Sequence, residues 1–397
     1  MTPYILYRNF GYDSYVICYR NGDYPYLETE VPGLKLLFIK RWANCFLGGI
    51  TRSVSKREQW ITKMLELFCT MLDAFFLIVR YGKQIDVLQL FHLKFESIFV
   101  GLIYRMINRK GILYLKLDMN PEIIRLYEGR PQIYYDRSMK RPRWRSLLAY
   151  PALRLISLDI IGVETRELYQ FMRMKHPLFK KFADRICYVP NGVDSKRLSP
   201  LIVNFEDKES IILHVGRIGS YQKGSDVVLE AFAGVSLDFP NWRLLLIGRM
   251  ENEFADYLRD FRSRGNETIR DKIVYVGSVE RERERLYEYY GKATILAFPS
   301  RFESFGFVAV EAGFFGDVIL GTNIPSVREI TNDGKFGCLC PVDDVKCFTE
   351  TLRYALSHEN YLKEKSESIK RFIMDNFDWN KICRDLHENI RRKLKDR

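Results

Sequence analysis

The stretch Phe298-Pro-Ser-Arg-Phe-Glu-Ser-Phe-Gly-Phe-Val-Ala-Val-Glu-Ala312 decides the fold of this chain. It begins at the end of an apolar run, Thr294–Phe298, which predicts a buried strand closed by a proline. A short polar loop follows, and then a helical pattern from about Phe307 to Phe315. Strand, loop and helix in this order form the repeating unit of a parallel sheet covered by helices. Two glutamates lie in this unit, Glu303 in the loop and Glu311 in the helix.

The same unit recurs throughout the second half of the chain. Apolar strands are predicted at Ile211–Gly216, Arg243–Gly248, Ile273–Gly277, Thr294–Phe298 and Val318–Gly321, with helical patterns at 226–235, 253–264, 281–290 and 307–315. Nearly continuous apolar strands joined by helices are typical of a parallel sheet that is buried on both faces.

The first half is less regular but compatible with the same architecture. Its predicted strands are Tyr15–Cys18, Leu36–Ile39, Val87–Phe91, Ile112–Leu117 and Ile160–Val163, and its predicted helices are 56–80, 96–109 and 165–172. The turn-rich stretch Tyr188–Pro200 suits a hinge between two domains. We therefore expect an α/β protein with two doubly wound, Rossmann-like domains facing across a cleft. They would span residues 1–190 and 191–375, with a C-terminal helix at 376–397 packing back on the first domain.

Composition agrees with two folded domains. A chain of 397 residues exceeds what one hydrophobic core usually serves, and 47% hydrophobic residues exclude a disordered chain. The eight cysteines show no CxxC spacing, which indicates small core residues of a reducing compartment. Cys338 and Cys340 alternate along a predicted strand, so we expect no metal site there.

No targeting segment is apparent in the sequence. It does not open with a signal-peptide pattern. The longest apolar run, Met71–Val79, is interrupted by Asp73 and has about half the length of a membrane span. These features predict a protein that is cytosolic or peripheral to a membrane.

Positive charge is concentrated in the first half. Residues 1–200 contain 32 Lys and Arg against 18 Asp and Glu, a net charge of +14, whereas residues 201–397 contain 30 against 32, a net charge of −2, which together give the overall +12. The densest basic patch surrounds Trp144 and consists of Arg137, Lys140, Arg141, Arg143 and Arg145. Such a patch suits an anionic membrane surface, although a solvated loop with one buried tryptophan is equally compatible. Since no nucleic-acid-binding motif is present, we expect no nucleic-acid partner.

A glycine turn with basic residues lies earlier in the second half. His214-Val-Gly-Arg217 ends a predicted strand, and Gln222-Lys-Gly224 precedes a helix. A strand that ends at Gly216 exposes backbone amides, and the helix N-terminus adds partial positive charge. Arg217 and Lys223 add two cations suited to a diphosphate. The alternative interpretation is an ordinary surface turn that happens to carry an arginine and a lysine.

The loop around Glu303 suits the neighbouring part of the same ligand. Ser304 and Gly306 are small or flexible, so the backbone N–H groups of this loop can point at a phosphate. Glu303, at the start of the helix, can reach a sugar ring beside that phosphate. Glu311, one to two turns into the helix, can accept hydrogen bonds from ribose hydroxyls.

In this order and separation, these motifs resemble those of the family 4 retaining glycosyltransferases, which have the GT-B fold. The resemblance extends from roughly Asp159 to Trp379. It also includes Val189–Asp194, Trp242–Gly248, Val274–Val279, Gly337–Asp343 and Phe377–Trp379.

The resemblance implies a role for each matching residue. Arg217 and Lys223 would hold the donor diphosphate and stabilise the leaving group, while Glu303 would contact the donor sugar near the reacting carbon. The implied catalytic residues are thus Arg217, Lys223 and Glu303, and the implied donor-binding residues are Gly216, Ser304, Phe305, Gly306, Phe307 and Glu311. The reaction would be a front-face displacement with retained anomeric configuration. It would need neither a metal ion nor another cofactor.

The first domain departs from the family pattern at its start. Relatives begin with a strand, a glycine-containing loop and a helix, whereas Met1-Thr-Pro-Tyr4 already reads as a helix here. Gly11 then leads directly into Tyr15–Cys18. We infer that the first strand and its loop are missing, through either a misplaced start codon or a true truncation. Loss of an interior strand would leave unpaired sheet edges.

The second departure concerns the acceptor side. Many relatives carry a histidine that lines the cleft, and Asp118 stands at the matching place in this chain. It could position or deprotonate an acceptor hydroxyl. His92 is the other acceptor-side candidate, with a purely structural histidine as the alternative.

Together these features predict a retaining hexosyltransferase that uses a UDP- or GDP-sugar. Its acceptor would be a growing cell-surface glycan of the capsule, O-antigen or exopolysaccharide type, carried on a lipid in one version of the hypothesis. The enzyme would then work in the cytoplasm, at the inner face of the cell membrane. Two alternatives stay open: an impaired or non-catalytic GT-B protein, and a sugar-nucleotide epimerase of the same fold.

Overall fold

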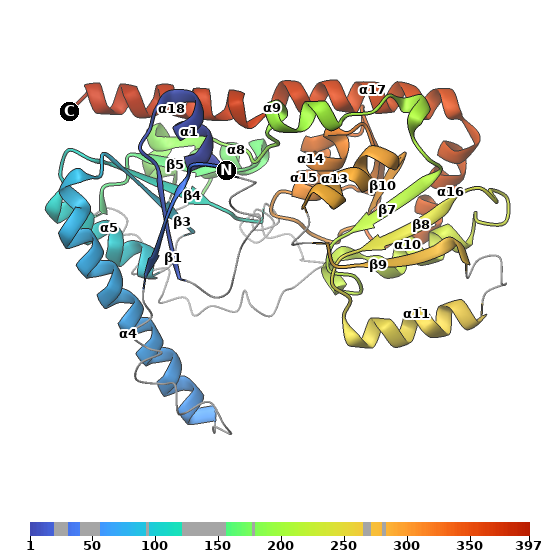
Figure 1. Cartoon of the computed structure of the whole chain (residues 1–397), viewed down its shortest axis with the longest axis horizontal. Helices are drawn as coiled ribbons and strands as arrows, with labels where there is room; N and C mark the ends of the chain where they lie inside the picture. Colours follow the sequence, from blue (N-terminus) through green and yellow to red (C-terminus); the bar gives the residue numbers. More distant parts are fainter. Residues whose placement is uncertain are drawn as a thin grey trace.

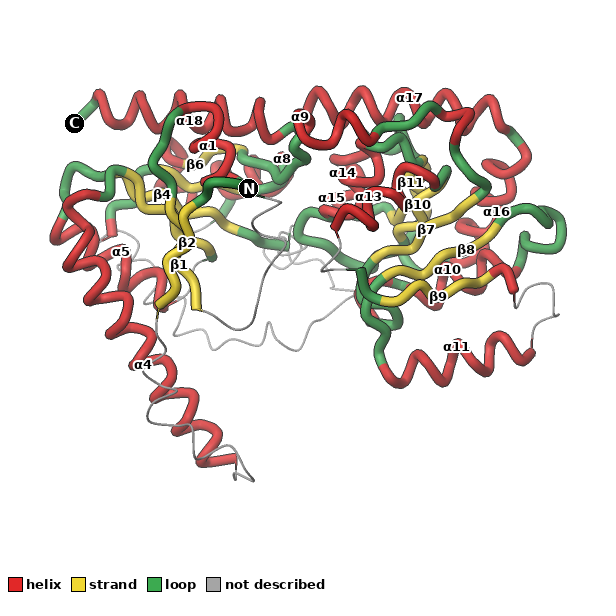
Figure 2. Tube along the Cα trace, viewed as in Figure 1, coloured by secondary structure: helices red, strands yellow, loops and turns green. Residues whose placement is uncertain are grey.

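The computed structural model describes residues 1–19, 31–39, 56–92, 95–120, 156–176, 179–264, 271–279 and 283–397. Two α/β domains lie next to each other, and the last two long helices run along the same side of both (Figure 1). In each domain the strands form a central layer with helices around it (Figure 2).

The N-terminal domain contains two groups of parallel strands. Its elements are α1 (Thr2–Phe10), β1 (Tyr15–Tyr19), β2 (Lys35–Ile39), α4 (Lys56–Tyr81), η1 (Gly82–Gln84), β3 (Val87–Phe91), α5 (Phe95–Ile107), β4 (Ile112–Leu117), β5 (Ile160–Val163), α8 (Arg166–Met174), η3 (Phe179–Arg185) and β6 (Ile186–Tyr188). Strands β3-β4-β5-β6 form one sheet in chain order, and β1 pairs with β2 separately. In the four-stranded sheet, each described strand therefore lies next to the one before it, and the order always proceeds in the same direction.

The C-terminal domain has the doubly wound arrangement. Its elements are α9 (Ser195–Leu198), η4 (Ser199–Leu201), η5 (Phe205–Asp207), β7 (Ile211–Val215), η6 (Tyr221–Lys223), α10 (Ser225–Ala233), β8 (Arg243–Ile247), α11 (Asn252–Arg264), β9 (Ile273–Gly277), α13 (Arg283–Lys292), β10 (Ile295–Phe298), α14 (Phe307–Phe314), β11 (Val318–Thr322), α15 (Pro325–Thr331), β12 (Cys338–Cys340), α16 (Val345–Ser357), α17 (Glu359–Asn376) and α18 (Trp379–Lys395). The parallel strands have the order β12-β11-β10-β7-β8-β9. This order reverses between β7 and β10, and such a switch point is where open α/β sheets bind ligands.

The strands predicted from sequence are confirmed, with ends that differ by a residue or so. Their burial explains why the pattern was readable, since every residue of β4, β5, β7, β10 and β11 is buried. Strand β6 was not predicted. It has three residues and runs directly into the turn-rich stretch, so its apolar signal is too short to recognise.

Cys338 and Cys340 lie on β12 as expected, and both side chains are buried. The described cysteines are free thiols: Cys69, Cys187, Cys338, Cys340, Cys347 and Cys383. Burial raises the pKa of the Cys340 thiol to about 12. Cys340 is therefore a packing residue held in its neutral form.

The chain passes between the domains twice, and the two passages are hydrogen-bonded to each other. Val193 donates its N–H to the carbonyl of Phe377, and Trp379 donates its N–H to the carbonyl of Val193, both at 2.8 Å. Asp194 accepts two hydrogen bonds from the Arg8 guanidinium on α1, at 2.6 and 2.8 Å. Helix α1 and the two passages are thereby fixed against one another.

The two hydrogen-bonded passages form what we call the domain crossing. Helix α18 continues from this crossing onto the N-terminal domain. Trp379, Ile382 and Leu386 pack in one buried cluster with Tyr4 and Ile5 of α1. The same cluster includes Ile112 and Tyr114 of β4 and Ile160 of β5. The last helix of the chain therefore covers the first domain.

Side chains also join the domains at the edge of the C-terminal sheet. Glu329 on α15 accepts hydrogen bonds from the Tyr188 hydroxyl at 2.6 Å and from the Arg166 N–H at 2.7 Å. Arg328 donates to Glu167 on α8 at 2.8 Å. Because Glu329 receives the first amide of α8, its charge also meets the positive end of that helix dipole.

The close contact at the crossing gives a test of the fold. A Cβ added at Gly192 would lie 2.3 Å from the Phe377 carbonyl oxygen, which is backbone and cannot move aside. We expect Gly192→Ala to lower the free energy of unfolding by at least about 2 kcal/mol, measured by urea denaturation. The matched control is Gly291→Ala on α13, where a Cβ would meet its nearest atom at 3.8 Å. A helical Ala there should be neutral or stabilising by about 0.5–1 kcal/mol. Equal stability of the two variants would contradict the described crossing.

Candidate functional site

The side chain of Lys223 passes across the end of β7, where Gly216 follows the strand and leaves room for it. A Cβ at Gly216 would lie 3.2 Å from both Cδ and Cε of Lys223, so any larger residue would press on that side chain. Gly216 also has φ of 151°, a conformation that suits glycine. A Cβ at Gly248, at the end of β8, would lie 1.9 Å from the Gly216 carbonyl oxygen. Two adjacent strand ends thus depend on glycine, and Lys223 occupies the space beside Gly216.

A buried histidine holds the loop between Gly216 and Gly224. His214 Nδ1 lies 3.1 Å from the Ala297 carbonyl oxygen, and Nε2 lies 2.8 Å from the Ser225 hydroxyl. A carbonyl oxygen only accepts, so Nδ1 carries the proton and Nε2 accepts from Ser225. The Ser225 oxygen in turn accepts the Gly219 N–H at 2.9 Å. Burial lowers the pKa of His214 to about 4, so the ring is neutral at ordinary pH.

Lys223 reaches across to Glu303, the loop glutamate predicted from sequence. The two form an ion pair, and the Lys223 ammonium also lies 5.4 Å from the centre of the Phe298 ring. Glu303 accepts a further hydrogen bond from the Ser300 hydroxyl at 2.9 Å. Its carboxylate is buried, with 8% of the residue exposed. The candidate leaving-group cation and the candidate sugar ligand are therefore direct partners.

Gln222 connects Arg217 to the same carboxylate. The exposed Arg217 donates to the Gln222 side-chain oxygen at 2.8 Å. Gln222 donates to the Phe302 carbonyl at 3.0 Å and to Glu303 at 3.3 Å. Sequence reasoning gave Gln222 no role, because a glutamine before a helix carries no chemical signal of its own.

Arg301 is a second residue whose role was not predicted. It is buried and forms ion pairs with Asp226 and Asp343, both at 2.6 Å. Its side chain also donates to the Tyr221 carbonyl at 2.7 Å, and its N–H donates to the Gln222 carbonyl at 2.8 Å. Arg301 thus fastens the loop after β10 to the turn that carries Lys223.

The helix that follows the loop begins without a side-chain cap. Gly306, the residue before α14, has φ of 97° and makes no side-chain capping bond. A helix start without such a cap offers its first amide donors to a ligand, and its dipole favours an anion. Phe305 is buried in the core and packs on Phe377, so its backbone alone is suited to ligand contact. Phe307 is half exposed at the helix start.

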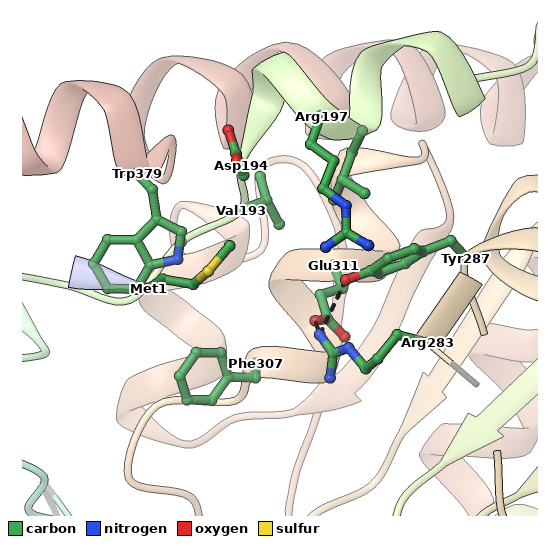
Figure 3. A pocket seen from close by; sticks show the side chains of 11 residues that line it. Met1, Val193, Asp194, Arg197, Arg283, Tyr287, Phe307, Glu311 and Trp379 are labelled. Carbon is green, nitrogen blue, oxygen red and sulfur yellow. Dashed lines mark hydrogen bonds and ion pairs between the residues drawn. The ribbon is translucent and has the colours of Figure 1, made fainter. Parts of the chain in front are cut away.

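Glu311 faces a hollow beside the domain crossing. Its carboxylate forms an ion pair with Arg283 on α13 and accepts a hydrogen bond from the Tyr290 hydroxyl at 3.3 Å. Figure 3 shows Arg283 and Tyr287 beside Glu311, with Arg197 pointing into the same hollow. The hollow is lined by Met1, Gly192, Val193, Asp194, Arg197, Leu198, Arg283, Tyr287, Phe307, Glu311 and Trp379. Arg283 and Tyr290 were not predicted, since only the folded chain brings α13 against α14.

The acceptor-side candidates lie at the carboxyl end of the N-terminal sheet. His92 follows β3, has φ of 59° and donates its N–H to the Lys116 carbonyl at 3.0 Å. Asp118 follows β4 and is exposed. Strands β3 and β4 are neighbours in the sheet, so the two candidates share one edge.

A buried charge pair lies beneath that edge. The Lys116 ammonium is 3.6 Å from the carboxylate of Glu164, which also accepts a hydrogen bond from Asn191 at 2.6 Å. Lys116 donates to the Val189 carbonyl as well. Burial raises the pKa of Glu164 to about 7, an increase that Lys116 opposes and Asp118 adds to. These groups were not predicted, because a lysine inside an apolar strand reads as a solvent-facing residue.

Three further expectations from the sequence concern a basic patch, a metal site and a membrane span. The basic patch Arg137, Lys140, Arg141, Arg143 and Arg145 lies outside the described residues. The described residues contain no group of three or more His, Cys, Asp or Glu side chains placed to hold a metal ion. Among the described helices, none is both long and apolar enough to cross a membrane.

The neutral state of His214 gives a pH test. In the unfolded chain its pKa is about 6.5, whereas in the folded chain it is lowered to about 4. Its contribution to stability is therefore complete above the unfolded value and is lost as the pH falls from there toward 4. The loss should amount to about 1.4 kcal/mol per pH unit. Urea denaturation between neutral and acid pH measures it.

His176 is also buried with a pKa lowered to about 4, whereas the Glu164 and Asp317 carboxyls, whose pKa values are raised to about 7, contribute a slope of the opposite sign. His214→Gln should therefore lower the slope of the unfolding free energy against pH by about 1.4 kcal/mol per pH unit relative to the wild type, whatever its effect on absolute stability. His358→Gln, at an exposed histidine, is the control and should leave the slope unchanged. An unchanged slope in His214→Gln would show that the buried neutral ring is wrongly assigned.

Comparison with known proteins supports the interpretation of the C-terminal half. Residues 196–372 match the model of the family described as glycosyl transferases group 1. Phosphatidyl-myo-inositol mannosyltransferase of Mycobacterium leprae is 26% identical over 208 residues, covering 49% of this chain and 50% of that protein. A 41.2 kDa protein in the cps region of Klebsiella pneumoniae is 25% identical over 244 residues, covering 60% of this chain and 63% of that protein. The matched part thus spans about half the length of the first relative and less than two thirds of the second.

Solved structures resemble the chain over nearly its full length. Sucrose-phosphate synthase from Thermosynechococcus elongatus superposes with a TM-score of 0.70 at 16% identity, covering 100% of this chain and 92% of that one. Anabaena Alr3699/HepE in complex with UDP and glucose superposes with a TM-score of 0.67 at 13% identity, covering 98% and 94%. The fold of this chain is therefore GT-B.

Proposed function

We propose that this chain, whose residues 196–372 form a glycosyl transferases group 1 domain, transfers a hexose from a UDP- or GDP-sugar with retention of configuration. One observation carries the proposal: two buried carboxylates, Glu303 and Glu311, lie before and within the same helix, each paired with a cation. They lie at the switch point of a doubly wound sheet. The structure of Alr3699/HepE with UDP and glucose supports a nucleotide-sugar donor for this fold.

The donor would lie along the start of α14. The diphosphate would accept hydrogen bonds from the backbone of Ser304, Gly306 and Phe307, at the positive end of the helix dipole. The ribose hydroxyls would donate to Glu311, and the sugar would donate to Glu303. Binding therefore replaces internal ion pairs by contacts to the ligand.

The chemical step moves one bond and one proton. The bond between the anomeric carbon and the diphosphate oxygen breaks, and the acceptor oxygen bonds to that carbon from the same face. The acceptor proton passes to the departing diphosphate oxygen. Lys223 and Arg217 stabilise the charge that develops on the diphosphate, so the residues of this chain supply the electrostatic assistance and we propose no metal ion or other cofactor.

The acceptor would approach from the carboxyl end of the N-terminal sheet, where Asp118 and His92 could orient its hydroxyl. We propose a growing cell-surface glycan of the capsule, O-antigen or exopolysaccharide type, carried on a lipid. The two relatives support this choice, since one is named for a mannosyl transfer to phosphatidyl-myo-inositol and the other is encoded in a cps region. The enzyme would work in the cytoplasm, at the inner face of the cell membrane.

Removal of either member of the Lys223–Glu303 pair tests the chemistry. We expect Lys223→Ala and Glu303→Gln each to lower kcat by about 10²–10³-fold, because each variant loses a group that acts on the developing charge or the sugar. Release of UDP or GDP with and without a glycan acceptor measures this. The controls are Lys346→Ala and Glu350→Gln on the exposed face of α16. Near-normal turnover in both site variants would contradict the assignment.

Glu311 should affect donor binding more than chemistry. We expect Glu311→Gln to weaken nucleotide binding by about tenfold or more, because two hydrogen bonds to a charged acceptor are lost. Isothermal titration with UDP and with GDP measures the change and identifies the preferred base. If affinity for both nucleotides stays at the wild-type value, the ribose does not lie on Glu311.

A further inference from the structure

Helix α4 carries a row of large apolar side chains that face solvent. They are Phe68, Leu72, Phe75, Phe76 and Val79, and the two most exposed, Phe76 and Phe68, are 64% and 58% exposed. Their spacing of four, three, one and three residues places them on one face of the helix. In Figure 1, α4 extends obliquely downward, beyond the strands of the N-terminal domain.

The opposite face of the helix already makes the core contact. Ile78 is 2% exposed and packs with Leu88 and Tyr104, and Leu77 adds to the same cluster. The apolar row is therefore not needed to attach α4 to its domain. A contiguous apolar patch of this kind on a folded protein marks a contact with a partner or a membrane.

Exposed cations gather where α4 ends. Asn108, after α5, donates to the Gly82 carbonyl at 3.1 Å and brings the ends of the two helices together. The exposed basic residues at these two ends are Arg80, Lys83, Arg109 and Lys110, with Asp86 as the acidic residue among them. Arg397 donates to the Arg109 carbonyl at 3.0 Å, while its charge is paired with that of Asp159.

The charges distinguish between possible occupants of this face. Residues 1–200 carry a net charge of +14, and exposed cations lie at the end of α4. A second copy of the chain lying along the row would therefore bring two basic halves together, which is unfavourable. An anionic lipid surface would instead neutralise this charge and take up the apolar row.

We propose that the outward face of α4 docks the protein on an anionic lipid surface, with Phe68, Phe76 and their neighbours entering the headgroup region. The inference rests on the proposed function for its purpose, because a lipid-carried acceptor places the substrate at such a surface. The contact itself needs no catalysis, so it is tested separately. It also places the membrane contact on α4, in addition to any role of the basic patch predicted from sequence.

Flotation of the full chain with vesicles tests the proposal. One set of vesicles is phosphatidylcholine alone, and the other contains phosphatidylcholine and phosphatidylglycerol in equal amounts. We expect the wild-type chain to float with the second set and to lose this binding at high salt. The double variant Phe68→Glu with Phe76→Glu should bind at least about tenfold more weakly, because each buried phenylalanine contributes that much or more to partitioning. Leu237→Glu, at another exposed apolar residue, is the matched control and should bind as the wild type does.

Other measurements separate the possible failures. Thermal unfolding and nucleotide titration show whether the double variant is folded and keeps its donor site. Wild-type binding that persists in the folded double variant, or absence of flotation with either vesicle set, would overturn the proposal. A wild-type dimer that becomes a monomer in the double variant, without vesicle binding, would assign this face to self-association instead. Absence of transferase activity in a wild-type chain that floats as expected would count against the proposed function alone.

Discussion

The parallel pairing of β7 with β10 is the constraint on which the candidate site depends. Ile212 and Leu213 lie opposite Ile295 and Leu296, so the loops that follow these strands leave the sheet as neighbours. These loops are 80 residues apart in sequence, yet Lys223 of the first reaches Glu303 of the second. The chain supports that contact from both sides. Gly216 clears the path of the lysine, and Arg301 fastens the second loop to the first.

The sequence was sufficient to predict the strands of the C-terminal sheet and the charged residues in the loops that follow them. Strands such as β4, β7 and β10 are buried along their whole length, so their apolar runs are unambiguous. Glycine or proline at the ends of the strands marks where each strand stops, and this signal can be recognised from a few neighbouring residues. Those same signals placed Lys223 and Glu303 in loops that follow two of the strands, although they could not show that these strands are neighbours or that the two side chains form an ion pair.

What the sequence could not predict is the set of partners that come from elsewhere in the chain. Arg283 and Tyr290 reach Glu311 because α13 packs beside α14, and Gln222 reaches Glu303 through a turn. None of these residue types is informative by itself. Strand β6 was not predicted for a different reason: its three residues are too few to show a pattern of apolar and polar positions.

The buried pair Lys116–Glu164 links the acceptor edge to the passage between the domains. Burying two charges is costly, and a well-packed apolar pair is often as stable, so stability alone does not account for it. Its partners are informative: Lys116 donates to Val189 and Glu164 accepts from Asn191, both at the start of the linker. A few residues later, Val193 is hydrogen-bonded to Phe377 and Trp379. Because these bonds form one connected series, a change in the angle between the domains must either carry the acceptor edge with it or break buried charged hydrogen bonds. The orientation of the acceptor edge is therefore coupled to the crossing that positions the donor domain.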